Sequence, residues 1–308
     1  MKTNYLLAAA VLLAVSPLTA HAQTATPVPA SPALASAAQP LTLRLKFTPG
    51  QTLYYSMTTD TNGTMLTGQS GAGMPIQIHM QMLMHQTVKE VRASDGAATI
   101  DVGIDTMSMG MSGQTMPIPP EKMAQMKTIG TMVILPTGKT VSFTPSSALS
   151  TSGPMPGMDL SHTNAMGSMG QFPDAPVKIG DTWKSAIAAG MMGMQVASAF
   201  SLTSLDAADG KTVAIIHQTT NGTFGGPGAD GAAAPGPVGM KMSGTVKGTG
   251  TLRFDVDAGT VLGQTSQADV AMTMTPPGAT EPMKMQMKAH STLARASAPA
   301  PVANPAVQ

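Results

Sequence analysis

The stretch from Val238 to Met274 constrains the fold more than any other part of this sequence. It contains two segments in which apolar and polar residues alternate, and Asp257-Ala258-Gly259 separates them. Such a pattern is typical of a long β-hairpin with one buried and one solvated face. The apolar residues of the first segment occupy even positions: Met240, Met242, Val246, Leu252, Phe254 and Val256. Its polar residues occupy odd positions: Lys241, Ser243, Thr245, Lys247, Arg253, Asp255 and Asp257.

The same alternation recurs through the chain, interrupted by Gly, Asp-Gly, Asn-Gly and Pro, and it predicts an all-β fold with little helix. One short helix is predicted from Pro120 to Lys127, because Pro and Glu commonly open helices. The predicted strands are 41–47, 52–58, 75–91, 97–111, 130–135, 139–144, 182–188, 192–205, 211–221, 239–257, 260–274 and 283–293.

Two segments of the chain, residues 41–149 and 171–295, share an order of motifs. Each begins with a G-x-T-apolar opener, at Gly50 and at Gly180, continues with a strand that turns at Asp-Gly, and ends with a hairpin that starts Gly-Thr. A Gly/Met/Pro loop at 150–170 separates them. We therefore expect an internal duplication: two similar antiparallel units, each a curved half-barrel or sandwich-like sheet, that pack together and cover each other's apolar face.

The two ends of the chain differ from this β-rich centre. Residues 1–22 contain Lys2, a short apolar run and Ala20-His21-Ala22, which predict a cleaved signal peptide. The apolar run is shorter than the ~20 residues that a bilayer requires. Residues 23–40 form an Ala/Pro linker and residues 296–308 a similar tail, both expected to be disordered. The prediction is an exported, soluble bacterial protein of the periplasm or the extracellular space, without a transmembrane segment in the mature chain.

Composition and missing motifs exclude several functions. The 17 basic and 16 acidic residues nearly balance and form no basic run, which argues against nucleic acid or an anionic membrane surface as a partner. The sequence has no Cys, so disulfides, thiolate metal sites and a lipid-anchored cysteine are excluded. It also lacks a G-x-S-x-G elbow, a P-loop, a zincin His-Glu pair and a dinucleotide fingerprint. We expect a non-enzymatic protein without a cofactor.

Methionine is unusually common, with 28 residues, and it recurs at every second position in several segments. Within 76–85, Met80, Met82 and Met84 share a face with Ile, whereas His and Gln take the other face. This division indicates that methionine fills the core, where its flexible side chain adapts well. The same flexibility suits a cavity for varied apolar ligands. The sequence leaves both interpretations open.

A different set of methionines suggests metal binding. In the loop at 150–170, thioethers and one imidazole lie three or four residues apart, the ligand types that suit Cu(I) or Ag(I). The alternative function is thus a periplasmic soft-metal-binding protein, and the simpler interpretation is a linker. The candidate ligands are Met155, Met158, His162, Met166 and Met169.

Three further features lead to specific expectations. Asp101 and Asp105 are expected on a solvated strand face rather than in a catalytic pair. The apolar parity changes after Ile104, which predicts a β-bulge or bend. No His has a carboxylate at ligand spacing along the sequence, and Trp183 is expected to anchor a core.

Four stretches together resemble an uncharacterised family of exported bacterial all-β proteins: FTPGQTLYY at 47–55, VKIGDTWKS at 177–185, an Asp-Gly turn and the late GTLRFD strand. At greater distance the long strands look like the half-barrels of periplasmic lipoprotein carriers, which shelter acyl chains. The resemblance implies an envelope protein that binds an apolar small molecule or lipid on a Met-lined β surface.

Overall fold

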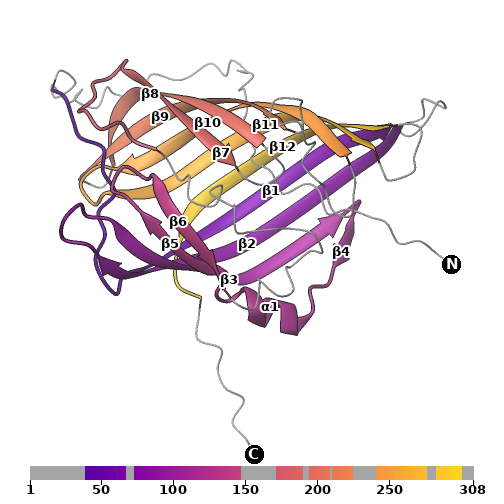
Figure 1. Cartoon of the computed structure of the whole chain (residues 1–308), viewed down its shortest axis with the longest axis horizontal. Coiled ribbons are helices and arrows are strands. Elements are labelled where there is room, and N and C mark those ends of the chain that lie inside the picture. Colours follow the sequence, from indigo (N-terminus) through magenta and orange to yellow (C-terminus); the bar gives the residue numbers. More distant parts are fainter. Residues whose placement is uncertain are drawn as a thin grey trace, which may run out of the picture.

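The computed structural model describes residues 39–66, 73–146, 171–189, 194–208, 210–224, 241–275 and 282–299. This part of the chain forms one twelve-stranded antiparallel sheet and one short helix, which confirms the predicted all-β class (Figure 1). The elements are β1 (Thr52–Leu66), β2 (Gly73–Val91), β3 (Ala98–Met111), β4 (Gln114–Met116), α1 (Pro120–Met126), β5 (Gly130–Ile134), β6 (Thr140–Pro145), β7 (Thr182–Ala189), β8 (Met194–Ala208), β9 (Lys211–Phe224), β10 (Lys241–Asp255), β11 (Thr260–Thr275) and β12 (Met283–Ala296).

The first and last strands lie side by side at the centre of the sheet. The strand order is β6-β5-β3-β2-β1-β12-β11-β10-β9-β8-β7, with β4 paired to β3. The β1–β12 pairing runs from Tyr54 opposite Ala296 to Leu66 opposite Lys284. The expectation of two half-sheets packed on each other is therefore wrong: the halves join edge to edge, because β1 and β12 satisfy each other's backbone hydrogen bonds. The internal duplication stays a prediction.

Local sequence signals predict several elements correctly. β10 and β11 form the expected hairpin, and Gly259 in its turn has a φ of 63°. Helix α1 begins at Pro120 as predicted. The expected bulge follows Ile104: Met84 opposes Ile104 and Leu83 opposes Thr106, which leaves Asp105 as the additional residue of β3.

Residues 41–47, here called the N-terminal strap, form no strand, contrary to the prediction. Their backbone amides bond to three separate places: Leu41 to the Val177 carbonyl at 2.8 Å, Leu45 to Pro136 at 2.8 Å, and Lys46 to Gly259 at 3.0 Å. The strap runs along one end of the sheet, as the indigo segment at the left of Figure 1. Because its amides are shared between an isolated bridge at Val177 and two turns, the alternating sequence has no neighbouring strand to complete a ladder.

The strap also shows that the sheet is strongly curved. Pro136 lies after β5 and Gly259 lies before β11, and five strand spacings of ~4.8 Å separate these strands in the sheet order. A flat sheet would place them ~24 Å apart. Yet they bond to Leu45 and Lys46, which are adjacent residues ~3.8 Å apart. The sheet therefore curls toward the strap, and we call its concave side the inner face.

The buried residues of the strands lie mainly on this inner face. At the strap end, Leu43 packs with Tyr55, Phe200 and Phe254. A second cluster under β2, β3 and β5 contains Ile100. The methionine pattern is also confirmed: Met285 and Met287 of β12 are buried, whereas the alternating Lys and Gln residues are exposed.

Candidate functional site

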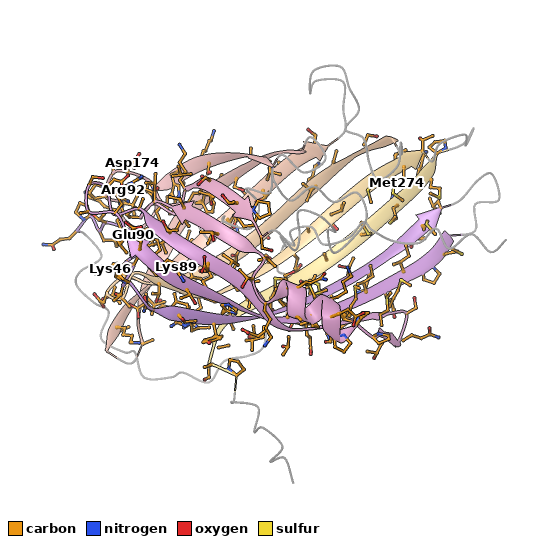
Figure 2. The ribbon with its side chains drawn as sticks, turned by 60° about the horizontal axis from the view of Figure 1, so that its bottom comes forward. Lys46, Lys89, Glu90, Arg92, Asp174 and Met274 are labelled. Atoms are coloured by element: carbon orange, nitrogen blue, oxygen red, sulfur yellow. The ribbon has the colours of Figure 1, made fainter. Side chains whose placement is uncertain are left out.

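A methionine-rich cluster lines the inner face at the end away from the strap, and we call it the methionine wall. Figure 2 shows this separation, with Met274 at one end of the sheet and Lys46 at the other. The wall comes from strands β1, β2, β8, β10, β11 and β12. Its residues are Met65, Ile76, Ile78, Val196, Val246, Ala268, Val270, Met272, Met274, Met283, Met285, Met287 and, where the cluster meets the middle of the sheet, Ala289.

Strand register brings these methionines together. Met65 of β1 opposes Met285 of β12, and Met285 opposes Met272 of β11. Residues directly opposite in antiparallel strands project on the same face with their Cβ atoms ~5 Å apart. Three thioether side chains therefore form a continuous row across three strands. Met283 and Met274 form a second pair, two residues farther from the strap along their strands.

The wall becomes exposed toward the tip of the β1–β2 hairpin. Met285 is only 4% exposed, whereas Met74, which opposes Met65, is 52% exposed. Met65 and Met283 are partly buried against the cluster. Apolar surface thus runs without interruption from a buried interior to a solvent-exposed rim. An apolar molecule could reach the inner face by this rim.

The middle of the inner face differs in chemistry from both ends. Uncharged polar side chains form a band there that crosses β1, β12, β11, β9, β8 and β7. Where the band crosses β10, the inner-face residues are glycines. We call it the polar band, and its members are Thr59, Thr61, Ser185, Ser198, Gln218, Thr220, Gln264, Ser266 and Ser291.

Hydrogen bonds connect the polar band across strands. The hydroxyls of Ser198 and Thr220 lie 2.9 Å apart, and the Gln218 amide nitrogen donates to both, at 3.3 and 3.1 Å. The Gln264 amide nitrogen donates to the Gln218 carbonyl oxygen at 3.3 Å. The buried hydroxyls of Ser198 and Thr220 and the half-buried amides of Gln218 and Gln264 satisfy one another in this way and form a neutral surface. The sequence pattern did not predict this band, although the inner positions of β11 change from Met to Ala, Ser and Gln along the strand.

The inner face is almost free of charge. Among the described strand residues that share this face, Arg295 is the single charged side chain, and it lies at the strap end with its guanidinium 5.8 Å from the centre of the Tyr55 ring. The exposed lysines of β12, Lys284 and Lys288, lie on the opposite face. The wall and the band therefore offer apolar contacts and neutral hydrogen bonds.

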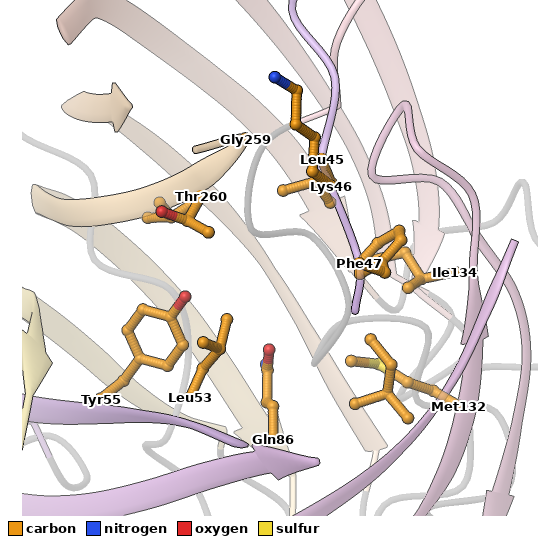
Figure 3. Close-up of a pocket in the computed structure, with 12 residues that line it drawn as sticks. Leu45, Lys46, Phe47, Leu53, Tyr55, Gln86, Met132, Ile134, Gly259 and Thr260 are labelled. Carbon is orange, nitrogen blue, oxygen red and sulfur yellow. The ribbon is translucent and has the colours of Figure 1, made fainter. Parts of the chain in front are cut away.

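A small cavity lies under the strap, between Leu45, Phe47, Tyr55 and Gln86 (Figure 3). Its volume is about 40 Å³, which is room for a few water molecules at ~10–15 Å³ each. Burial raises the pKa of the Tyr55 hydroxyl, and Arg295 opposes that rise. The cavity is too small for an acyl chain, so the methionine wall is the better candidate for an apolar ligand.

Two histidine–carboxylate pairs lie on the outer face, contrary to the expectation from sequence spacing. His79 Nδ1 lies 2.6 Å from an oxygen of Asp60, and His85 Nδ1 lies 2.9 Å from an oxygen of Asp105. Both pairs form between neighbouring strands, which is why spacing along the chain did not reveal them. Within the described residues, no group of three His, Cys, Asp or Glu side chains is placed to hold a metal ion.

Other predicted features have mixed outcomes. Asp101 and Asp105 do not form one site, since Asp101 accepts a hydrogen bond from Thr131 at 2.7 Å and Asp105 pairs with His85.

The alternation predicts Asp255 on the solvated face, but this residue is 1% exposed. It accepts a bond from the Ala258 amide at 2.8 Å and lies 3.6 Å from the Lys211 amine. Trp183 is partly buried and packs against the core at the strap end, stacked on Phe200.

The proposed metal ligands lie outside the residues that the structure describes. Met155, Met158, His162, Met166 and Met169 all fall between 147 and 170. The soft-metal alternative therefore stays a prediction. In the described part of the chain, no helix is long and apolar enough to cross a membrane.

Fold and site together define a curved single-sheet β protein with a methionine-lined inner face. A family model described as a family of unknown function (DUF6263) matches residues 162–262, about a third of the chain. No curated protein matches the sequence.

Solved structures give distant matches. A lipovitellin structure, described for its lipid–protein interactions, has 8% identity and a TM-score of 0.44; the match covers 85% of this chain and 27% of the lipovitellin chain. This chain thus spans about a quarter of that protein's length. DynF from Micromonospora chersina has 7% identity and a TM-score of 0.20, covering 87% and 92% of the two chains. The hypothetical lipoprotein YmcC from Escherichia coli (K12) has 12% identity and a TM-score of 0.21, covering 78% and 87%.

Proposed function

We propose that this protein is an exported, soluble, non-enzymatic binding protein of the bacterial envelope, and that it holds an apolar ligand against the methionine wall. The observation that carries the proposal is the register of Met65, Met285 and Met272 on one concave face that opens at an apolar rim. Thioether side chains rearrange at low energetic cost, so such a surface accommodates flexible acyl chains.

Export is supported by residues 1–22, whose charge and apolar pattern predict a signal peptide. The non-enzymatic role is supported by the inner face, which in the described residues presents thioethers, amides and hydroxyls and only one charged group. An apolar wall binds by removing hydrocarbon surface from water, which stabilises a complex by ~25 cal/mol for each Å² buried.

The proposal is tested by native mass spectrometry of the full chain purified from a bacterial periplasm. We expect co-purified lipid mass on the wild-type protein. The variant Met272→Gln/Met285→Gln places two amides of similar size in the central row of the wall, and we expect it to lose at least about nine-tenths of that mass, because unpaired buried amides cost ~1–3 kcal/mol each.

Met116→Gln is the matched control, because Met116 lies on β4, is exposed and is no member of the wall. It should retain lipid like the wild type. Thermal unfolding of each variant shows whether the wall variant is folded at the temperature of purification. If folded wild-type protein carries no lipid and takes up none from acyl-lipid micelles, the proposed function is wrong.

A further inference from the structure

The polar band lies at a defined depth behind the methionine wall. On β12, Met283, Met285 and Met287 of the wall are followed by the small Ala289 and then by Ser291 of the band. On β11 the same order is Met274, Met272, Val270, Ala268 and Ser266. A ligand that enters at the rim and lies along the strands therefore meets hydrocarbon first and hydrogen-bonding groups second.

The wall is longer than one acyl tail. Met283 and Ser291 are eight residues apart on β12, which corresponds to ~27 Å of strand at ~3.4 Å per residue. The hydrocarbon of one bilayer leaflet is about half of the ~30 Å core, or ~15 Å. An acyl tail laid along β11 and β12 with its polar end at the band therefore lies entirely against the wall and ends before the rim.

Where the wall meets the band, the inner-face side chains of β10, β11 and β12 are small. Ala268, Ala289 and Gly248 oppose one another across β11, β12 and β10. They project less from the sheet than the methionines of the wall do. On β9, Thr220 opposes Gly248, and the Gln218 amide stands one inner-face position closer to the strap, bonded to Thr220. The band thus combines small, buried side chains at its centre with donors and acceptors at its flank.

The chemistry of the band selects against charge. Amide and hydroxyl groups both donate and accept hydrogen bonds, so they match esters, amides and hydroxyls. A carboxylate or phosphate at this depth would lose its hydration and find no cation beside it, which is costly. Arg295, the nearest candidate among the described residues of this face, lies two inner-face positions farther along β12 than Ser291 and stacks over Tyr55.

We propose that the ligand is a neutral acyl lipid of the monoacylglycerol type, with its tail along the methionine wall and its uncharged ester and hydroxyl groups bonded in the polar band. This inference rests on the proposed function and specifies the class of lipid. The Gln218 and Gln264 amides bind the head group directly, and the wall is indifferent to head-group chemistry.

The test compares three probes with the same palmitoyl tail: monopalmitoylglycerol, palmitate and palmitoyl lysophosphatidic acid. Each is titrated at pH 8 into delipidated full-length protein, with binding followed by isothermal titration calorimetry. We expect monopalmitoylglycerol to bind at least about tenfold more tightly than either anion, since a buried unpaired charge is disfavoured. In Gln218→Leu/Gln264→Leu this preference should fall to about twofold or less.

Replacing both amides together removes a donor and its acceptor at once, which is usually well tolerated by a fold. The matched control is Gln286→Leu on the outer face of β12, which should keep the full preference. If the wild type binds all three probes equally, or the anions more tightly, the neutral-lipid inference is wrong while the proposed function stands. If no probe binds, the proposed function itself is overturned.

Discussion

Single residues decide how the strap closes its end of the sheet. Gly259 has a φ of 63°, a left-handed conformation that side chains disfavour, and its carbonyl accepts the Lys46 amide. A Cβ atom built on Gly259 would lie 2.7 Å from the Lys46 backbone nitrogen. This glycine is therefore required both for the turn and for the close approach of the strap.

Gly259→Ala should consequently destabilise the protein by roughly 3 kcal/mol, from left-handed strain plus the lost strap contact. Gly113→Ala is the control: Gly113 also has a positive φ, 82°, but a Cβ atom added there would meet nothing within 4 Å. It should cost only about 1–2 kcal/mol. Urea unfolding gives both free energies, and equal losses would contradict a special role for the Gly259–Lys46 contact.

Elements show where sequence patterns suffice and where they fail. The β10–β11 hairpin, α1 and the bulge at Asp105 depend on neighbours close in sequence, and the patterns predict them correctly. The strap has the same alternation as a strand, yet its partners are an isolated bridge at Val177 and the turns at Pro136 and Gly259, from three distant regions. The His85–Asp105 pair and the polar band also depend on which strands are neighbours, which no local signal encodes.

The strap is nevertheless a strong stabilising element. Leu43 is 1% exposed in the cluster that contains Phe254 and Leu202. Leu43→Ala should lower the free energy of unfolding by ~2–5 kcal/mol, because the cavity it leaves is enclosed. Leu66→Ala at the exposed hairpin tip should change it by ~0.5 kcal/mol or less. Chemical denaturation measures both, and similar effects would mean that the strap is loosely attached.

At the scale of the whole molecule, the two halves of the chain share one sheet and one curved inner face. The clusters at both ends contain residues from the first and the second half. The sequence motifs at Gly50 and Gly180 favoured two separate units, because the same order of motifs occurs in each half of the chain. Only the β1–β12 pairing joins the strands of the two halves in the described sheet, and it links residues more than 200 positions apart.

We therefore expect the described sheet to unfold as one cooperative unit. Trp183, the single tryptophan, lies in the second half and reports its tertiary structure by fluorescence, whereas far-UV circular dichroism reports all strands. The two signals should give the same urea midpoint. A fluorescence midpoint clearly separated from that of circular dichroism would show that the halves unfold independently.

The central β1–β12 pairing also determines when the sheet can be completed during folding. β1 is made well before β12, so β1 keeps one unpaired edge until β12 has been synthesised. Pairing over so long a loop is slow, and an exposed strand edge accepts any matching strand. Two copies that meet in this interval can exchange their last strands, and protein concentration during folding then determines whether a sheet is completed by one chain or by two.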